Sequence, residues 1–327
     1  MFASLGKGSM KIIAIEEHFS LPSRTVSNPI IVERARARLK HDLEAESIGL
    51  DRSRIAAMDA AGIAMQVLSC TGLQAVEPEV AVPLAREVND TAYAAIQRHP
   101  TRFSAFAALP TADPPAAVRE FERAVQTLGF RGALIANHTR GAYMDDKRFW
   151  PIFACAEALD VPIYLHPSAP HPLVMQAYFE GFGDIATAPW GYAIDTGTHF
   201  LRLVFAGVFD AFPKLKIILG HFGESIPFWI TRTNAHTAFN AKKRGLKYEY
   251  KDYVQNNLWV TCSGHFYQPA FLCTMLAMGI EKILFAVDWP FEENEVAVDF
   301  LQRLPVSEAD RQRVAHGNAE ALLKLPS

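Results

Sequence analysis

The sequence predicts a single (β/α)8 barrel, in which eight parallel strands form a closed cylinder inside a ring of helices. Eight short apolar segments alternate along the chain with longer amphipathic segments, as this fold requires. The length of 327 residues suits one large α/β domain. Half of the residues are hydrophobic and only 20% are charged, which supplies a large buried core. We expect residues 1–10 to be a disordered N-terminal tail and residues 11–327 to form the barrel domain.

The eight apolar segments are the predicted strands. They are rich in Ile, Leu, Val and Ala, which is typical of parallel strands buried on both faces. No GxGxxG or phosphate-loop glycine pattern follows any of them, and this favours a barrel over a doubly wound open sheet. The segments are Lys11–Glu16, Ile63–Ser69, Phe103–Leu109, Gly132–Ala136, Val161–Leu165, Lys214–Gly220, Asn257–Cys262 and Lys282–Val287.

Helices are predicted between these strands. Asp51–Ala61 places apolar side chains three residues apart on one face. Pro114–Leu128 follows Asp113, a suitable N-cap before a proline at the first helical position. The other predicted helices are Val80–His99, Phe149–Leu159, Tyr192–Phe209, one beginning at Glu224, Pro269–Met278 and two at the C-terminus. The long connections after strands one and five, around residues 24–50 and 170–188, are expected to be lid insertions or oligomer contacts.

Composition narrows the functional classes. The net charge of −3 argues against an electrostatic nucleic-acid binder. No apolar run reaches the ~18 residues needed to span a bilayer, and the first ten residues lack the apolar core of a signal peptide. Four widely spaced cysteines without a CxxC pair are expected to be buried thiols of a cytoplasmic protein.

Chemistry-bearing side chains stand at the carboxyl ends of several predicted strands, where the active sites of such barrels lie. Glu16 and His18 close the first strand, and their two-residue spacing points both to one face. His166 closes the fifth strand and Asp288 the eighth. Two imidazoles and two carboxylates suit Zn²⁺ or Mn²⁺, and the sequence does not choose between these ions. We therefore expect Glu16, His18, His166 and Asp288 to bind one divalent metal ion.

These residues belong to motifs that resemble the amidohydrolase superfamily. The likeness is to the branch that contains the hydroxybenzoate decarboxylases and the aminocarboxymuconate semialdehyde decarboxylase, and it covers essentially the whole chain. The first motif is Glu-x-His in place of the usual His-x-His, a variant that looks like γ-resorcylate decarboxylase and its relatives. The matching segments are Ala14–Phe19 (AIEEHF), Tyr164–Pro167 (YLHP), Ile218–Glu224 (ILGHFGE), Thr261–Phe266 (TCSGHF), Ile283–Glu292 (ILFAVDWPFE) and Asn318–Leu325 (NAEALLKL).

The resemblance implies non-oxidative, metal-dependent decarboxylation of an aromatic acid with a hydroxyl group next to the carboxylate. By this analogy Asp288 donates a proton to the ring carbon, His221 orients Asp288 or shares its proton, and Glu224 holds His221. A mononuclear metal site is favoured because Asn137 and His138 follow the fourth strand, where binuclear members carry a bridging Lys or Glu. The candidate substrate-binding residues are Arg232, Phe291, Trp190 and Phe19.

Two departures from the family's motifs, both on predicted active-site loops, leave the substrate open. After the fourth strand this chain has Ala136-Asn137-His138, where a Val-Asn-Gly type sequence is common in the family. The hydroxybenzoate decarboxylases carry His-Pro-Arg-Asn-Pro after the fifth strand, where this chain has Ser168 and Ala169 in place of the Arg and Asn. The alternative function is a metal-dependent hydrolase that attacks a lactone, ester or amide with a metal-bound water. A third reading, a catalytically silent barrel that acts as a binding protein, does not explain four potential ligands at the strand ends. The expected partners are a small aromatic acid and further copies of the chain, as a homodimer or homotetramer.

Overall fold

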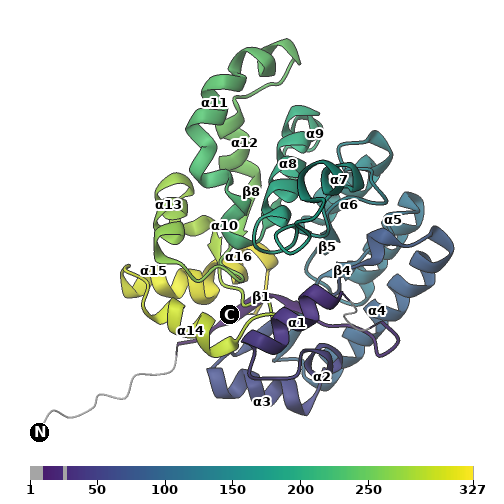
Figure 1. The fold of residues 1–327 in the computed structure, drawn as a ribbon, viewed down its shortest axis with the longest axis vertical. Coiled ribbons are helices and arrows are strands. Elements are labelled where there is room, and N and C mark those ends of the chain that lie inside the picture. Colours follow the sequence, from purple (N-terminus) through teal and green to yellow (C-terminus); the bar gives the residue numbers. More distant parts are fainter. Residues whose placement is uncertain (1–9, 25–27, 327) are drawn as a thin grey trace, which may run out of the picture.

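The computed structural model describes residues 10–24 and 28–326, and these form the predicted barrel of parallel strands with helices outside it (Figure 1). Residues 1–9 of the predicted tail lie outside the described residues. The strands are β1 (Ile13–His18), β2 (Met65–Ser69), β3 (Phe103–Ala105), β4 (Ala107–Ala108), β5 (Ala133–Ala136), β6 (Ile163–His166), β7 (Ile217–Leu219), β8 (Leu258–Thr261) and β9 (Ile283–Leu284).

The helices follow the predicted alternation, with extra short helices in the connections. The α-helices are α1 (Pro29–Arg38), α2 (Leu43–Ile48), α3 (Arg52–Ala61), α4 (Pro78–Arg98), α5 (Pro114–Glu122), α6 (Trp150–Leu159), α7 (Pro172–Phe179), α8 (Gly191–Phe205), α9 (Val208–Ala211), α10 (His221–Glu224), α11 (Ile226–Lys243), α12 (Tyr250–Asn257), α13 (Gln268–Met278), α14 (Asn294–Gln302), α15 (Glu308–Gln312) and α16 (Asn318–Leu323). None of the helices in the described part of the chain combines the length and apolar character needed to cross a membrane.

Across the described residues, the nine strands make one closed barrel with two seams, where two sheets meet. β1-β2-β3 form one parallel sheet and β4 to β9 another. At the first seam, Phe106 donates its backbone N–H to Leu68 O (2.9 Å) and Ala107 donates to Gly132 O (2.8 Å), so the predicted strand 103–109 serves both sheets. At the second seam, Ile15 N donates to Phe285 O (3.2 Å) and Asp288 N donates to Glu16 O (3.1 Å).

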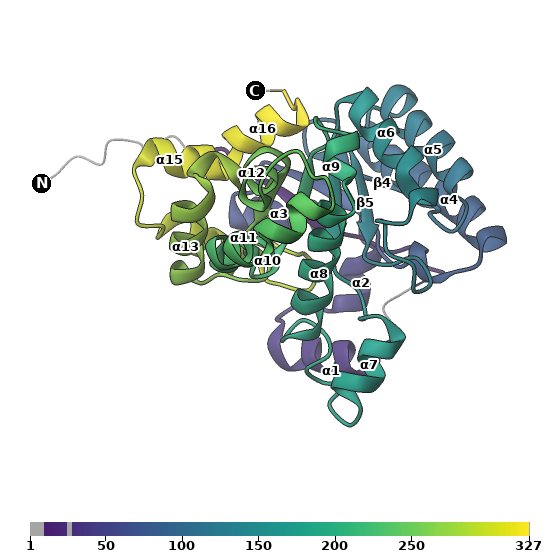
Figure 2. The ribbon, with the colours of Figure 1, turned by 90° about the horizontal axis from the view of Figure 1, so that it is seen from above.

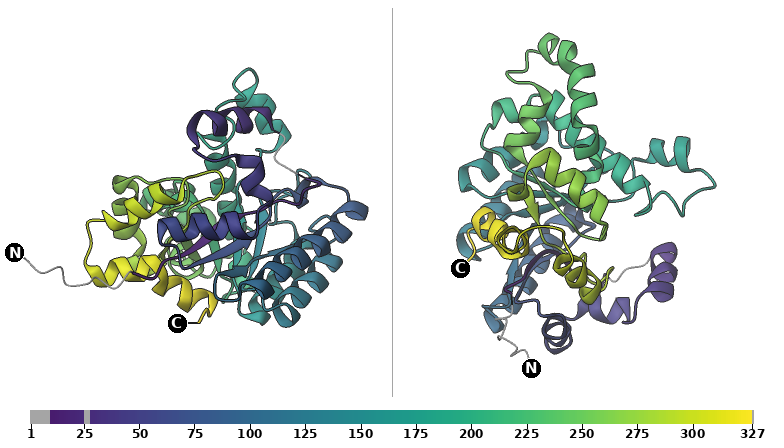
Figure 3. Two further views of the ribbon diagram at one scale, coloured as in Figure 1. Left: turned by 90° about the horizontal axis from the view of Figure 1, so that it is seen from below. Right: turned by 90° about the vertical axis from the view of Figure 1, so that its left-hand side faces the viewer.

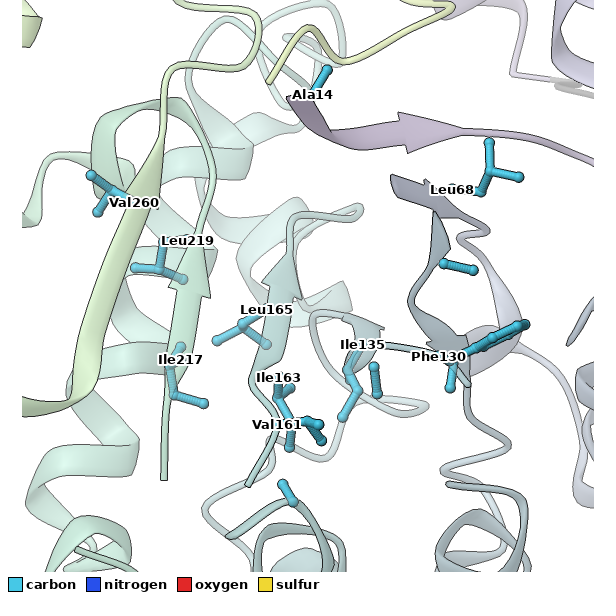
Figure 4. Packing of buried hydrophobic residues seen from close by; sticks show 14 of the residues in the cluster. Ala14, Leu68, Phe130, Ile135, Val161, Ile163, Leu165, Ile217, Leu219 and Val260 are labelled. Carbon is cyan, nitrogen blue, oxygen red and sulfur yellow. The ribbon is translucent and has the colours of Figure 1, made fainter. Parts of the chain in front are cut away.

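Alternating side chains build two apolar layers. One layer fills the barrel with residues such as Ile15, Val67 and Ile218, and residues of α16 cover its lower end. The other layer lies between the strands and the surrounding helices and includes Ile163 and Leu219 (Figure 4). The apolar core inside the barrel ends below the carboxyl ends of the strands. The inward-facing side chains at these ends are therefore available to form a site.

A β-bulge in β1 interrupts the two-residue alternation of inward-facing and outward-facing side chains. Ala14 pairs with Gln66, but Glu17 pairs with Leu68, so β1 has one residue more than β2 over this stretch. Ile15 belongs to the barrel interior, and the extra residue allows Glu16 to face inward as well. His18 then shares the face of Glu16, while Glu17 faces Gln66 and the helix layer.

Both long connections rise above the same end of the barrel. α1 and α2 follow β1, α7 follows β6, and α1 and α7 lie together on one side of the molecule (Figure 2). Arg34 on α1 joins them, because its Nη2 donates to Asp184 O (3.0 Å) and Thr187 Oγ1 (3.1 Å). The insertions after strands one and five are therefore present, and their role as lids remains a prediction. The hairpin of α11 and α12 projects separately from the barrel (Figure 3).

Candidate metal centre and active site

The structure brings together the four predicted metal ligands. One ligand atom from each of Glu16, His18, His166 and Asp288 lies within 4.8 Å of the others. His18 Nε2 is 3.2 Å from Asp288 Oδ1, and His166 Nε2 is 3.3 Å from Glu16 Oε1. The four come from three strand ends that are distant in sequence, so the closure of the barrel assembles the cluster.

Hydrogen bonds fix the two imidazoles in the tautomer that a metal ligand needs. His18 Nδ1 lies 2.9 Å from Ser69 Oγ, and His166 Nδ1 lies 2.7 Å from the carbonyl oxygen of Pro167. The Pro167 carbonyl can only accept, so Nδ1 of His166 carries the proton and Nε2 keeps its lone pair. With Ser69 Oγ as acceptor, His18 has the same arrangement, and both Nε2 atoms face the cluster.

Glu16 is held by hydroxyl groups from neighbouring strands. Its Oε2 accepts hydrogen bonds from the Tyr164 hydroxyl and from Thr261 Oγ1, the latter at 3.1 Å. Tyr164 stands two residues before His166 on β6 and therefore points to the same face. Gly220 leaves little room for a side chain beside them, because a Cβ there would lie 3.1 Å from the Tyr164 hydroxyl and 3.2 Å from Glu16 Oε2.

The donor set fits a divalent cation. Glu16 Oε1 and His18 Nε2 are buried and have no hydrogen-bond partner among the described residues. Buried polar atoms without partners are costly, and a cation at the centre of the cluster would satisfy both. Burial lowers the pKa of His18, and the neighbouring His166 lowers it further, so the imidazole is neutral, as a ligand must be.

A second group lies beside the ligands. His221 Nε2 is 3.8 Å from Asp288 Oδ2 and 4.0 Å from Glu16 Oε1, while its Nδ1 is 2.7 Å from Glu224 Oε1. The backbone after β7 turns sharply, and His221 and Glu224 both have positive φ angles (52° and 51°). This turn directs the two side chains toward each other, which agrees with the predicted pairing.

Charge places a proton on His221 and keeps Asp288 ionised. Burial alone would lower the pKa of His221, but the charges of Glu224 and Glu16 and the bond to Asp288 raise it well above its usual value. Burial would likewise raise the pKa of Asp288, but His18 and His221 hold it well below its usual range. The positive charge of His221 and the negative charge of Asp288 thus stabilise each other.

Two cavities open onto these residues. The α1 cavity, of about 720 Å³, is lined by His166, Asp288, Phe291 and residues of the insertion after β1. The α13 cavity, of about 660 Å³, is lined by Trp190, His265 and residues of α13. Tyr192, His221 and Asp288 border both cavities, so the proton-bearing pair is accessible from either side.

Two predicted substrate residues do not reach the site within this chain. Phe19 is 3% exposed and packs into the layer between strands and helices, because it follows His18 on the opposite face. Arg232 is exposed on α11, with its guanidinium 6.0 Å from the Trp229 ring centre, and borders neither cavity. Phe291 does border the α1 cavity and contacts the His18 ring edge at 5.9 Å between centroids.

Sequence reasoning missed several residues of the site. Ser69 and Tyr164 could have been found from the sequence, since each lies at or near the carboxyl end of a predicted strand. Tyr192 and Arg34 could not, because they lie on connections whose path the strand pattern does not specify. His265, on the loop after β8, also borders the α13 cavity.

Comparison with known proteins assigns the family. The amidohydrolase family model matches residues 41–325. The chain belongs to the amidohydrolase family. Within it, the chain is 36% identical over 324 residues to the γ-resorcylate decarboxylase of Polaromonas sp. strain JS666, covering 96% of this chain and 98% of that protein. This places it among the carboxy-lyases of the family.

Solved structures of family members agree. A dihydroxybenzoic acid decarboxylase from Polaromonas sp. JS666, with bound manganese and the inhibitor 2-nitroresorcinol, superimposes with a TM-score of 0.86 at 35% identity and covers 96% of this chain and 97% of that one. A 5-carboxyvanillate decarboxylase from Sphingomonas paucimobilis gives 0.88 at 33% identity, covering 97% of this chain and all of the other. These structures confirm the barrel, and this chain brings together four residues that could hold a divalent ion such as the manganese of the Polaromonas enzyme.

Proposed function

We propose that this protein catalyses the metal-dependent, non-oxidative decarboxylation of a hydroxylated aromatic acid of the ortho-hydroxybenzoate type. The observation that carries the proposal is the cluster of Glu16, His18, His166 and Asp288 with the imidazole of His221 beside it. A hydrolase would need only the metal ligands and an activated water. The kinship with named decarboxylases and the aromatic wall of Phe291 favour a carboxy-lyase.

A divalent ion bound at these four residues would act as a Lewis acid toward the phenolic oxygen and carboxylate and would fix the orientation of the ring. Direct loss of CO2 from an aromatic ring would leave an aryl carbanion of prohibitive energy. Protonation of the ring carbon that bears the carboxylate avoids this, because the new C–H bond takes an electron pair from the ring. The bond to the carboxylate then breaks, its electron pair restores aromaticity, and CO2 leaves.

Asp288 is the proposed immediate proton donor and His221 the proposed store of the proton. The direction of their pKa shifts puts the proton on His221 before substrate arrives. Transfer from His221 Nε2 to Asp288 Oδ2 requires the present 3.8 Å separation to shorten by roughly 0.6–1 Å, to hydrogen-bond distance. Glu224 fixes the imidazole through the 2.7 Å contact to Nδ1 and stabilises its charge, so it is a positioning residue.

The test begins with metal content and product. Protein loaded with Mn²⁺ or Zn²⁺ is assayed for CO2 release from hydroxybenzoates and, in parallel, for hydrolysis of aryl esters and lactones. CO2 release in proportion to bound metal supports the proposal. Hydrolysis without CO2 release would reassign the chain to the hydrolases of its family, and failure to retain metal would contradict both activities.

The proton donor is tested with Asp288→Asn. General acids contribute about 10²–10⁴ to rates, so turnover should fall by at least about a hundredfold. Asp299→Asn makes the same change at an exposed position of α14 and is the matched control. If Asp288→Asn keeps its metal and its activity stays within about tenfold of wild type, roughly 1.4 kcal/mol on the barrier, Asp288 is not the donor.

Assembly and location complete the proposal. The projecting α11 carries exposed Phe228, Trp229 and Phe239, which are 47–78% exposed in the single chain. Such large apolar side chains gathered on one helix favour contact with another copy, as a homodimer or homotetramer. All four cysteines are unpaired, which fits the reducing cytoplasm. Light scattering with size-exclusion chromatography would test the assembly.

A further inference from the structure

Two buried ionisable side chains lie behind the metal ligands, between β1 and α3. Glu17 and Arg54 are both fully buried (0% exposed), although acidic and basic side chains rarely are. Neither of them lines the α1 cavity or the α13 cavity. Replacing buried ionic groups by apolar side chains often leaves a protein equally stable. Core stability alone therefore gives no reason for these two residues, and the groups that they contact point to another role.

The Glu17 side chain joins β1 to the segment that carries Asp288. Its Oε1 accepts the backbone N–H of Val287 (2.9 Å), the residue immediately before Asp288. Its Oε2 accepts a hydrogen bond from Gln66 Nε2 (3.3 Å) on β2. Since Glu17 stands between the two metal ligands of β1, one side chain connects those ligands to the ligand at the far side of the seam.

This side chain takes the place of a backbone contact at the seam. Ile15 N donates to Phe285 O (3.2 Å), and Asp288 N donates to Glu16 O (3.1 Å). A regular parallel ladder would offer the N–H of residue 287 a carbonyl acceptor on β1. Here the side-chain oxygen of Glu17 accepts that N–H. The position of Asp288 relative to β1 therefore depends on a side chain as well as on the backbone.

Arg54 fixes the backbone of another metal ligand from the helix layer. Its Nη2 donates to His18 O, while its Nε and Nη1 make no hydrogen bond to the described residues. Burial lowers the pKa of Arg54 to about 10, so the guanidinium keeps its charge at neutral pH. Within the described part of the chain, this buried guanidinium thus directs its hydrogen bond to the backbone of a metal ligand.

We propose that Glu17 and Arg54 are positioning residues of the metal centre, which act from outside the barrel wall to set the spacing between the ligands of β1 and Asp288. This inference rests on the proposed metal-dependent function. Glu17 acts through Val287 N, and Arg54 acts through His18 O. Metal sites need their ligands held within about 0.5 Å of the productive geometry, and contacts behind the ligands provide this support.

The experiment measures metal affinity and metal geometry on the full-length protein. Glu17→Ala removes the acceptor of the Val287 N–H, and Arg54→Met removes the donor to His18 but keeps a long apolar side chain. Each variant should weaken Mn²⁺ binding by about 10–100-fold in competition with a chelator. The electron paramagnetic resonance spectrum of bound Mn²⁺ should also change, because it responds to ligand geometry. Glu17→Gln keeps an oxygen for the Val287 N–H and should recover most of the affinity.

Asn89 on α4 provides the matched control, because it holds the backbone of a strand that carries no metal ligand. Its Nδ2 donates to Ala108 O (3.0 Å), and its Oδ1 accepts from Ala108 N (2.9 Å). Asn89→Ala should lower the free energy of unfolding and leave the Mn²⁺ affinity and spectrum unchanged. The double variant Glu17→Gln/Arg54→Met leaves no buried charge unpaired, so its metal-free form should be as stable as the wild type. Its Mn²⁺ affinity should nevertheless stay low.

The double variant decides the question even if Glu17→Ala does not fold. Mn²⁺ affinity within about threefold of wild type, with an unchanged spectrum, would reduce Glu17 and Arg54 to supports of the fold and overturn the proposal. A double variant that is unfolded without metal would overturn it as well. If no hydroxybenzoate releases CO2, the proposed decarboxylation fails, and the affinity and the spectrum still decide whether these residues position the metal ligands.

Discussion

Substitution of Ser69 by alanine tests the side-chain contact that orients the metal ligand His18 without touching the metal. Ser69 is fully buried, and its Oγ is 2.9 Å from His18 Nδ1. Without this acceptor the buried N–H loses its partner, which costs about 1–3 kcal/mol. The imidazole can avoid this cost only by moving the proton to Nε2, which removes the lone pair that binds the ion. Either outcome should weaken metal affinity by about 10–100-fold.

The assay is competition for Mn²⁺ or Zn²⁺ with a chromophoric chelator at fixed pH. Ser69→Thr retains the hydroxyl and should bind close to wild type. Ser104→Ala makes the same change on β3, where the hydroxyl has no described hydrogen bond, and is the control. Metal affinity of Ser69→Ala within about threefold of wild type, with an unchanged fold by circular dichroism, would refute the idea that Ser69 sets the tautomer of His18.

Three further predictions concern the residues around the cluster. Gly220→Ala should destabilise the protein or its metal complex by about 1–3 kcal/mol, because the new Cβ meets Tyr164 and Glu16 at 3.1–3.2 Å; denaturant titration with and without metal checks this. Glu224→Gln removes the largest charge that raises the pKa of His221, so the imidazolium should lose its proton at a lower pH. The alkaline limb of the kcat/KM profile should then shift to lower pH, and a limb that does not shift would exclude His221 as the proton store. Burial raises the pKa of Glu17 to about 8, so the folded state retains a proton that the unfolded state releases. The free energy of unfolding should therefore decrease as the pH rises from about 4.5 to 8. Glu17→Gln should flatten this pH dependence in urea titrations of the metal-free protein.

The sequence predicted the barrel and its metal ligands because both follow from short-range rules. Apolar segments of strand length indicate parallel strands, and side chains at their carboxyl ends must meet at one mouth. Simple alternation along β1 does not explain why both Ile15 and Glu16 face the barrel interior. A β-bulge turns Glu16 inward, and no residue of β1 indicates this bulge in the sequence. Phe19 lies in the layer between strands and helices, as ordinary alternation after His18 requires, so its proposed place at the substrate came from the family resemblance and not from the strand pattern.

The positions of residues on the long connections and on the outer helices could not be predicted from the sequence. Arg34 reaches the α1 cavity only because α1 packs against the loop that ends at Thr187, a contact between residues 153 positions apart. No periodicity in either segment specifies that contact. Arg232 shows the converse. Its resemblance to a family position suggested a place at the substrate, but α11 carries it away from both cavities of its own chain.

The two seams of the barrel give the metal cluster a mechanical role. Glu16 and His18 belong to the three-stranded sheet, while His166 belongs to the six-stranded sheet and Asp288 follows its last strand. An ion held by all four residues would link the two sheets where β1 meets the segment after β9. It would add to the backbone hydrogen bonds that join the sheets at this seam. At a free metal concentration one hundred times the dissociation constant, this link adds about 2.7 kcal/mol to the stability of the fold. Metal supply would then govern how long the protein survives in the cell as well as how fast it works.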